Sequence, residues 1–166
     1  MTLINILNMP QEIERKFILF KIPDHLPTLK IKQGYLQLDK NCTIRVRSSI
    51  SSAGINDTLT IKGPSNSSGI SRYEFETKIS NEDSINLFKI CHKPIIEKTR
   101  HIYIHKNMKW ELDEFHKENQ GLLIGEVELE RENMKFDIPD IVKEEVTGQS
   151  KYYNSMLQKR PYKTWQ

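Results

Sequence analysis

The sequence lacks the patterns that mark a metal finger, a secreted domain or a membrane protein. Its two cysteines, Cys42 and Cys91, lie far apart and form no Cys-x-x-Cys or Cys/His spacing, so a zinc site is not expected. Two reduced cysteines in a cytoplasmic protein are favoured over a disulfide. The apolar run from Leu3 to Leu7 is too short to span a membrane and lacks the basic segment and cleavage site of a secretory signal.

Neither sign of charge is in large excess, since 25 basic and 22 acidic residues leave a net charge of only +3. Such a small excess does not by itself indicate binding to nucleic acid or to a membrane. The five histidines stand in no clustered metal-ligand spacing. Because no repeat of fixed long period and no long linker is present, we expect one domain over residues 11–166, preceded by an extension over residues 1–10.

What the sequence has in abundance is alternation of apolar and polar residues with period two, which predicts β-strands. Several connections are short and rich in turn-forming residues, which favours antiparallel neighbours. The expected strands are residues 11–20, 33–39, 42–49, 57–63, 71–79, 95–105, 108–116 and 122–130.

Helices are fewer, and one of them has a clear start signal. Ser80, with Asp83 three residues later, resembles a capping box that begins a helix near residues 81–92. The buried side of this helix is expected to carry Ile85, Leu87 and Phe88.

The remaining helical signals are short. Residues 24–27 predict a turn or short helix, and residues 139–158 predict short helical pieces broken at Thr147 and Gly148, the last of them capped by Ser150. Eight mainly antiparallel strands with few helices indicate an α+β, mainly β fold. We expect an eight-stranded antiparallel β-barrel that forms a tunnel, with a few covering helices, since closure also removes exposed sheet edges.

The charged side chains of the strands alternate strictly. In the first strand, Glu12, Glu14 and Lys16 share one face, while Arg15 falls on the other face and should be a structural residue. The same parity places further charged residues on one face of each later strand: Arg45, Arg47, Lys62, Arg72, Glu74, Glu76, Lys78, Lys98, Arg100, Lys109, Glu111, Asp113, Glu126, Glu128 and Glu130. An ordinary solvated sheet face is the simpler interpretation of such a pattern.

Two features favour a functional interior over a solvated face. Glu126, Glu128 and Glu130 are three acids in a row, about 6.5–7 Å apart along a strand, where a solvated face would gain by mixing signs. The acidic first and eighth strands are also separate from the basic third, fourth and sixth strands. Paired carboxylates suit Mg²⁺ or Mn²⁺ and clustered Lys and Arg suit phosphate oxygens, so this pattern predicts a metal and a multivalent anion inside the barrel.

An ordered series of motifs runs from about residue 11 to residue 158. The motifs are Glu12-Ile13-Glu14-Arg15-Lys16, Gln33-Gly34-Tyr35-Leu36, Arg45-Val46-Arg47, Thr60-Ile61-Lys62, Glu74-Phe75-Glu76, Lys98-Thr99-Arg100, Glu111-Leu112-Asp113-Glu114-Phe115, Gly125-Glu126-Val127-Glu128-Leu129-Glu130, Glu145-Val146-Thr147-Gly148 and Tyr152-Tyr153-Asn154. Together they resemble the CYTH domain, or triphosphate tunnel metalloenzyme, family, and the first is similar to its ExExK signature. The resemblance implies an eight-stranded tunnel that binds a triphosphate lengthwise and uses Mg²⁺ or Mn²⁺.

The resemblance also implies roles for particular residues. The expected triphosphate-binding residues are Lys16, Arg45, Arg47, Lys62, Lys98 and Arg100. The expected metal-binding carboxylates are Glu12, Glu14, Glu126, Glu128, Glu130 and Asp113. The expected catalytic set is Tyr35 and Lys62, which resemble a pair around the reacting phosphate, with Glu128 and Glu130, which would hold a metal or orient the attacking water. Glu74 and Glu76 resemble acids that orient the basic side chains or bind metal indirectly.

The implied activity is metal-dependent hydrolysis of a small-molecule triphosphate, first of all inorganic tripolyphosphate to diphosphate and phosphate. The compact length resembles the short bacterial members, and we expect a cytoplasmic monomer or homodimer with no nucleic-acid or membrane partner. Thiamine triphosphate hydrolysis, class IV adenylyl cyclase activity and a non-catalytic polyphosphate- or nucleotide-binding module are the alternatives. The segment that carries Lys151 either packs on the barrel or plugs one tunnel entrance, with Lys151 holding substrate.

Overall fold

The computed structural model describes residues 11–39, 41–67 and 71–165, so the expected extension over residues 1–10 lies outside the described part of the chain. The strands are β1 (Gln11–Leu19), β2 (Thr28–Leu38), β3 (Thr43–Ser51), β4 (Gly54–Ser65), β5 (Ser71–Lys78), β6 (His92–His105), β7 (Met108–Phe115), β8 (Leu123–Glu128) and β9 (Val142–Glu145). The helices are α1 (Asn81–Ile90), α2 (Asn154–Lys159) and the single 3₁₀ turns η2 (Lys117–Asn119), η3 (Ser150–Tyr152) and η4 (Tyr162–Thr164). Among these, no helix is long and apolar enough to cross a membrane.

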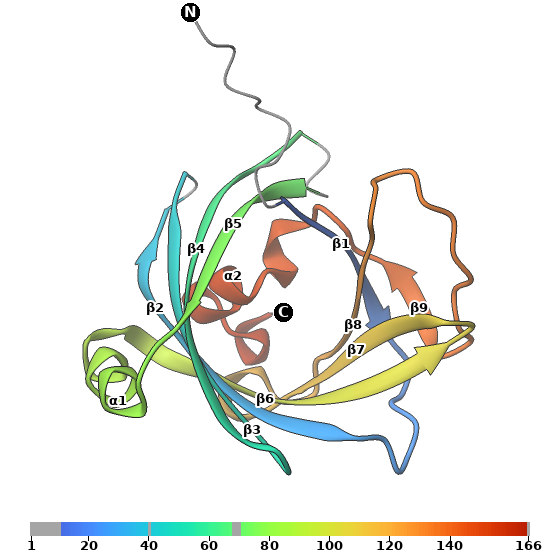
Figure 1. Ribbon diagram of the computed structural model, residues 1–166. Coiled ribbons are helices and arrows are strands. Elements are labelled where there is room, and N and C mark those ends of the chain that lie inside the picture. Colours follow the sequence, from blue (N-terminus) through green and yellow to red (C-terminus); the bar gives the residue numbers. More distant parts are fainter. Residues whose placement is uncertain (1–10, 40, 68–70, 166) are drawn as a thin grey trace, which may run out of the picture.

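The strands form one antiparallel sheet that curls into a barrel (Figure 1). Their order is β5-β4-β3-β2-β6-β7-β8-β1-β9, and β1 also pairs with β5, from Gln11 opposite Tyr73 to Ile13 opposite Ser71. That short pairing joins the two sides of the sheet and confirms the predicted eight-stranded barrel. Figure 1 looks along the barrel axis.

The ninth strand corrects the prediction for the tail, since β9 lies within the segment expected to be helical. It pairs with the end of β1, with Phe17 opposite Glu145 and Ile18 opposite Glu144. A segment of 4 residues carries too little periodicity to be recognised as a strand from sequence. Its conformation is set instead by the backbone edge that β1 offers beyond its contact with β5.

The predicted helix after β5 is confirmed, and so is its cap. The backbone N–H of Asp83 donates to Ser80 Oγ at 3.0 Å, which satisfies one of the free amides at the start of α1. The expected burial of Ile85 is wrong, because its side chain is 53% exposed while Ser84 is buried. Ser84, Leu87 and Phe88 share one helix face at i, i+3 and i+4, and that face is turned toward the barrel.

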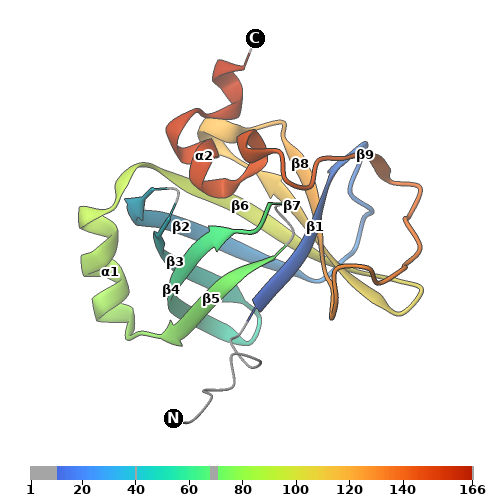
Figure 2. The same cartoon turned by 90° about the horizontal axis from the view of Figure 1, so that it is seen from above.

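The apolar residues divide into one cluster outside the barrel and one at its end. Outside, Phe17, Trp110, Leu112 and Val127 pack beneath the segment that includes Phe136. At one end, apolar residues of the barrel strands pack against the C-terminal segment. The strand residues are Tyr35, Ile96, Phe115 and Ile124, and the C-terminal residues are Val146, Tyr152 and Leu157. Figure 2 shows α2 and the C-terminus gathered at that end, so the C-terminal segment closes it.

Arg15 is a structural residue, as its parity predicts. Its Nε donates to Glu145 Oε1 at 2.6 Å, and its Nη2 pairs with the other oxygen of the same carboxylate. The guanidinium carbon also lies over the rings of Phe17 and Phe136, 5.8 and 5.3 Å from their centroids. This bidentate pair ties β9 to β1, and its hydrogen bonds lower the pKa of Glu145.

Glu145→Gln is expected to lower the thermal unfolding midpoint at pH 7 by roughly 3 °C. A carboxylate whose pKa is lowered in the folded state stabilises above its unfolded pKa, and that stabilisation is lost as pH falls through the folded value. The difference between wild type and variant should therefore shrink below about pH 4. Glu144→Gln is the matched control, and equal midpoints for the two variants at pH 7 would contradict the role of the Arg15 pair.

Candidate active site

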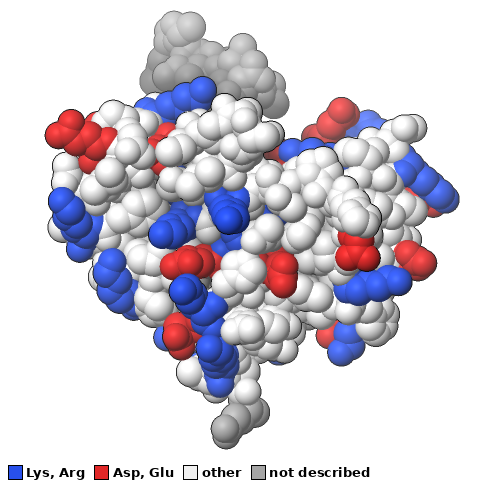
Figure 3. Space-filling view, turned by 90° about the horizontal axis from the view of Figure 1, so that it is seen from below, with Lys and Arg blue, Asp and Glu red and all other residues white. Residues whose placement is uncertain are grey.

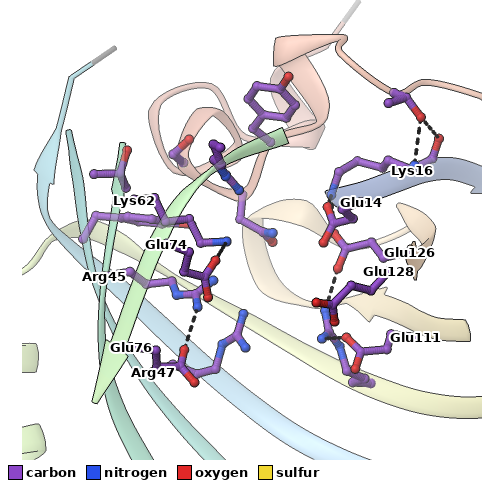
Figure 4. A pocket seen from close by; sticks show the side chains of 18 of the residues that line it. Glu14, Lys16, Arg45, Arg47, Lys62, Glu74, Glu76, Glu111, Glu126 and Glu128 are labelled. Carbon is purple, nitrogen blue, oxygen red and sulfur yellow. Dashed lines mark hydrogen bonds and ion pairs between the residues drawn. The ribbon is translucent and has the colours of Figure 1, made fainter. Parts of the chain in front are cut away.

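The barrel interior encloses a cavity of about 540 Å³ lined mostly by charged side chains (Figure 4). The charged lining residues are Glu14, Lys16, Arg45, Arg47, Lys62, Arg72, Glu74, Glu76, Arg100, Lys109, Glu111, Glu126 and Glu128. At the closed end it is lined by Thr147, Gly148, Tyr153, Asn154 and Ser155. Alternation places these strand side chains inside because β-strand residues i and i+2 share a face.

One wall of the cavity is basic and is formed by β3 and β4, with β5 alongside (Figure 4). Arg45 Nη2 donates to Thr60 Oγ1 at 3.0 Å and lies 3.4 Å from a Glu76 carboxylate oxygen. Lys62 Nζ lies 2.6 Å from Glu74, which stands opposite it on β5. The predicted role of Glu74 and Glu76 in orienting basic side chains agrees with these contacts.

Arg47 is the least paired cation of this wall. Its Nη2 donates to Gln33 Oε1 at 3.5 Å, its Nε has no hydrogen-bond partner, and among the described residues no carboxylate lies within 4.0 Å of it. Burial, followed by the nearby charges of Arg45 and Arg100, lowers its pKa to about 10. A multivalent anion in the cavity would relieve this destabilisation of the charged guanidinium.

The facing wall, formed by β1, β7 and β8, is acidic (Figure 4). Cross-strand register places Glu14 opposite Glu128, and Glu126 opposite both Lys16 and Glu111. Lys16 Nζ pairs with Glu126 and lies 3.2 Å from Glu14. Four carboxylates thus stand on adjacent strands, and Lys16, Arg100 and Lys109 pair with some of them.

Arg100 binds several of the acids at once. Its Nε and Nη2 each lie 2.7 Å from an oxygen of Asp113, Nη2 also lies 2.8 Å from Glu126, and Nη1 pairs with Glu111. Burial alone would raise the pKa of Asp113, but Arg100 and Lys98 outweigh it and the pKa is lowered. The same balance, with Lys16 as the strongest cation, holds the pKa of Glu126 well below its usual range. Both carboxylates are therefore ionised near neutral pH.

Glu128 differs from its neighbours, because within the described part of the chain it has no hydrogen bond or ion pair. Its side chain is exposed to the cavity, and it stands opposite Glu14 across the β1–β8 pair. No three His, Cys, Asp or Glu side chains among the described residues converge as a ready metal cage. Mg²⁺ commonly takes one or two carboxylates and completes its shell with water and phosphate oxygens. The unpaired carboxylate of Glu128, next to Glu14, fits that requirement.

The structure brings most of the predicted site residues together but leaves several out of the lining. Tyr35 and Lys62 both line the cavity, as do the predicted Lys16, Arg45, Arg47, Arg100, Glu14, Glu126 and Glu128. Glu12 stands opposite Arg72 in the β1–β5 pairing, but its side chain lies outside what the structure describes. Glu130 is exposed beyond the end of β8 and is not part of the lining.

Lys98 and Asp113 are buried behind the lining. Asp113 is 0% exposed, and both of its oxygens are bound by Arg100. Lys98 Nζ pairs with Asp113 and lies 3.3 Å from Asn154 Oδ1, and burial lowers its pKa to about 8. In this arrangement Asp113 orients Arg100 instead of facing the cavity. Direct metal binding by Asp113 and Glu130, and substrate contact by Lys98, stay predictions.

Some lining residues were not assigned a site role from sequence. Arg72, Lys109 and Glu111 have the parity of the charged face, so alternation was the signal that identified them. Thr147, Gly148, Tyr153 and Asn154 belong to the family motifs but were given no site role, and only the fold places them at the end of the cavity. Lys151 does not hold this end of the cavity: its Nζ lies over the rings of Tyr152 and Trp165, at 4.8 and 5.4 Å from their centroids.

The charge segregation is a property of the interior. On the outer face seen in Figure 3, basic and acidic side chains are interspersed and form no large patch of one sign. A closed barrel with a cationic wall facing a carboxylate wall defines a class of proteins that bind a multivalent anion beside a divalent cation. The sequence profile of the CYTH domain matches residues 10–161. The chain therefore belongs to the CYTH domain family.

Relatives of known activity or structure agree with this assignment. The chain is 42% identical over 164 residues to an inorganic triphosphatase of Acetivibrio thermocellus, covering 95% of this chain and 99% of that protein. It also resembles the crystal structure of an inorganic triphosphatase at a TM-score of 0.64 and 29% identity, covering 89% of this chain and 93% of the other. A putative adenylyl cyclase from Hippeastrum, described as having a dominant triphosphatase activity, shares the fold at a TM-score of 0.54 and 16% identity over 72% of this chain and 80% of its own.

Proposed function

We propose that the protein is a divalent-metal-dependent triphosphatase that hydrolyses inorganic tripolyphosphate to diphosphate and phosphate. The observation that carries this proposal is the opposition, across one cavity, of a cationic wall that includes Arg47 and a carboxylate wall that includes Glu128, neither of which has an oppositely charged partner among the described residues. Similarity over nearly the full length to an inorganic triphosphatase supports the same activity. The triphosphate lies along the cavity between the two walls.

The cationic wall binds the phosphate oxygens. The Nε groups of Arg45 and Arg47 have no partner in the part of the chain that the structure describes, and an Arg guanidinium can engage two phosphate oxygens at once. Lys62, Arg72 and Lys16 add positive charge around the chain of phosphates. These groups stabilise the negative charge on the transferred phosphoryl group and on the leaving diphosphate, which is the main demand of phosphoryl transfer.

The carboxylate wall would hold the metal. Glu14 and Glu128 are the residues placed to bind it, with Glu126 held in position by Lys16 and Arg100. A bound Mg²⁺ or Mn²⁺ would neutralise phosphate oxygens and make water a better nucleophile. The water oxygen forms a bond to the terminal phosphorus as the bond from that phosphorus to the bridging oxygen breaks. Diphosphate leaves with the bridging oxygen, and the proton of the water passes to the solvent.

Tyr35 and Lys62 stand at the same cavity, consistent with a role beside the reacting phosphate. Burial raises the pKa of Tyr35, although Arg45 and Arg47 act against that shift. The phenol is therefore neutral at pH 7 and serves as a hydrogen-bond donor to a phosphate oxygen. Lys62, held by Glu74, supplies a positive charge near the same group.

The activity is tested by incubating the pure protein separately with tripolyphosphate, ATP and thiamine triphosphate, each with Mg²⁺ or Mn²⁺. Phosphate release chiefly from tripolyphosphate is expected. Release chiefly from thiamine triphosphate would show that thiamine triphosphate is the preferred substrate. Formation of cyclic AMP from ATP would show that the protein is a cyclase and not a hydrolase. Tight binding without turnover under every metal would indicate a non-catalytic binding module.

Removal of divalent metal with EDTA is expected to reduce phosphate release from tripolyphosphate to the background rate. Added Mg²⁺ or Mn²⁺ in excess of the chelator should restore it, because the carboxylates of Glu14 and Glu128 need a cation between them and the substrate. An undiminished rate in EDTA would show that hydrolysis needs no divalent metal. The carboxylates of the acidic wall would then serve only as ion-pair partners of Lys16 and Arg100.

A further inference from the structure

Gln33 on β2 joins the Tyr35 hydroxyl to the basic wall of the cavity. Its side chain is 0% exposed, its Nε2 lies 3.1 Å from the Tyr35 hydroxyl oxygen, and its Oε1 lies 3.5 Å from Arg47 Nη2. We propose that Gln33 is a positioning residue that turns the Tyr35 O–H toward the bound triphosphate. The inference rests on the proposed function and goes beyond it by assigning a direction to one hydrogen bond.

The direction follows from which groups can only donate. Arg47 is a guanidinium and has no acceptor, so the amide oxygen of Gln33 must face it. The amide nitrogen of Gln33 then faces Tyr35, and the phenol oxygen accepts its hydrogen bond. The amide cannot flip without placing its N–H groups against the N–H groups of Arg47. Arg47 thus fixes the orientation of the Gln33 amide, and the Gln33 amide fixes the orientation of the Tyr35 hydroxyl.

The proton of the Tyr35 hydroxyl has no acceptor in the described part of the chain. The charges acting on this phenol come from Arg45, Arg47, Arg72 and Lys16, all of which are donors only. Tyr35 itself lines the cavity. With its lone pair occupied by Gln33, the phenol presents its O–H to the cavity, where phosphate oxygens are acceptors without donors of their own. A bound triphosphate completes the chain Arg47, Gln33, Tyr35, phosphate.

A double-mutant cycle tests this arrangement, with Gln33→Met, which removes the amide at similar size, and Tyr35→Phe, which removes the hydroxyl. In the wild-type background Gln33→Met is expected to lower kcat for tripolyphosphate about tenfold, with a much smaller change in KM. In the Tyr35→Phe background the same substitution should lower kcat less than about twofold, because the hydroxyl it orients is already absent. An equal loss in both backgrounds would show that Gln33 acts through Arg47 or through packing alone, and no loss in either would show that it does not position Tyr35 for turnover.

Gln33→Glu is a second test, and its expected result would not follow if Gln33 served only in packing. The carboxylate is similar in size and pairs with Arg47, but it can only accept, so it draws the Tyr35 O–H away from the cavity. We expect kcat to fall further than in Gln33→Met, although a hydrogen bond to Tyr35 is kept. A smaller loss in Gln33→Glu than in Gln33→Met would overturn the assigned direction.

The cycle separates this inference from the proposed function. If the wild-type protein binds tripolyphosphate without hydrolysing it, the proposed function fails, and the same non-additivity is then sought in the tripolyphosphate Kd by calorimetry. Thermal unfolding midpoints of all variants identify any loss of folding. A wild-type protein that neither binds nor hydrolyses tripolyphosphate would overturn both.

Discussion

Glu128→Gln is expected to lower Mg²⁺-dependent hydrolysis of tripolyphosphate by roughly 100-fold or more. Glu128 is the cavity carboxylate that has no cationic partner among the described residues, and it stands opposite Glu14 on the neighbouring strand. Glutamine keeps the size of the side chain but removes the negative charge that a divalent cation requires. Phosphate release is measured as a function of Mg²⁺ concentration, and the half-saturating concentration should rise.

Glu130→Gln is the matched control for this substitution. Glu130 is the same residue type two positions further along the chain, yet it is exposed and lies outside the cavity lining. On geometry alone its loss should change turnover far less than the loss of Glu128. Similar losses in both variants would support the sequence prediction that Glu130 also binds metal. Unchanged activity in Glu128→Gln would show that the metal is not bound at this wall.

Arg47→Met is expected to raise KM for tripolyphosphate roughly 30-fold, which corresponds to about 2 kcal/mol at 25 °C. Arg47 is buried in the cavity wall, and its only hydrogen bond to a described residue is the 3.5 Å contact to Gln33. Methionine keeps much of the apolar stem but removes the charge. Because no carboxylate among the described residues is left unpaired by the change, the loss should fall on substrate binding instead of folding.

Arg131→Met serves as the control for Arg47→Met, because Arg131 is exposed and is not part of the cavity lining. Steady-state kinetics separate KM from kcat, and the thermal midpoint reports folding. An unchanged KM in Arg47→Met would show that the anion is bound elsewhere in the barrel. A large fall in the midpoint of Arg47→Met would assign this residue to folding.

The fold was predictable because its main signal is local. Alternation along β1, β3 and β4 identified the strands and separated the inward Lys16 from the outward Arg15, since each property depends only on residue parity. The charge pattern indicated a multivalent anion beside a metal, and the ordered motifs added the family, the triphosphate and the roles of Tyr35 and Lys62. The ninth strand was missed because a segment as short as Val142–Glu145 takes its conformation from the edge of β1.

The sequence by itself determined most of the side chains that face the interior, and hence that the barrel is charged inside, although Glu130 has the parity of the lining and lies outside it. Tertiary structure alone decided which of those charges neutralise one another. Arg100 occupies both oxygens of Asp113, whereas Glu128 and Arg47 remain without an opposite charge among the described residues. Parity is fixed by neighbours in the chain, but ion pairing depends on the register between strands that are distant in sequence. The same reason explains why the Gln33 contacts with Tyr35 and Arg47 are visible only in the folded barrel.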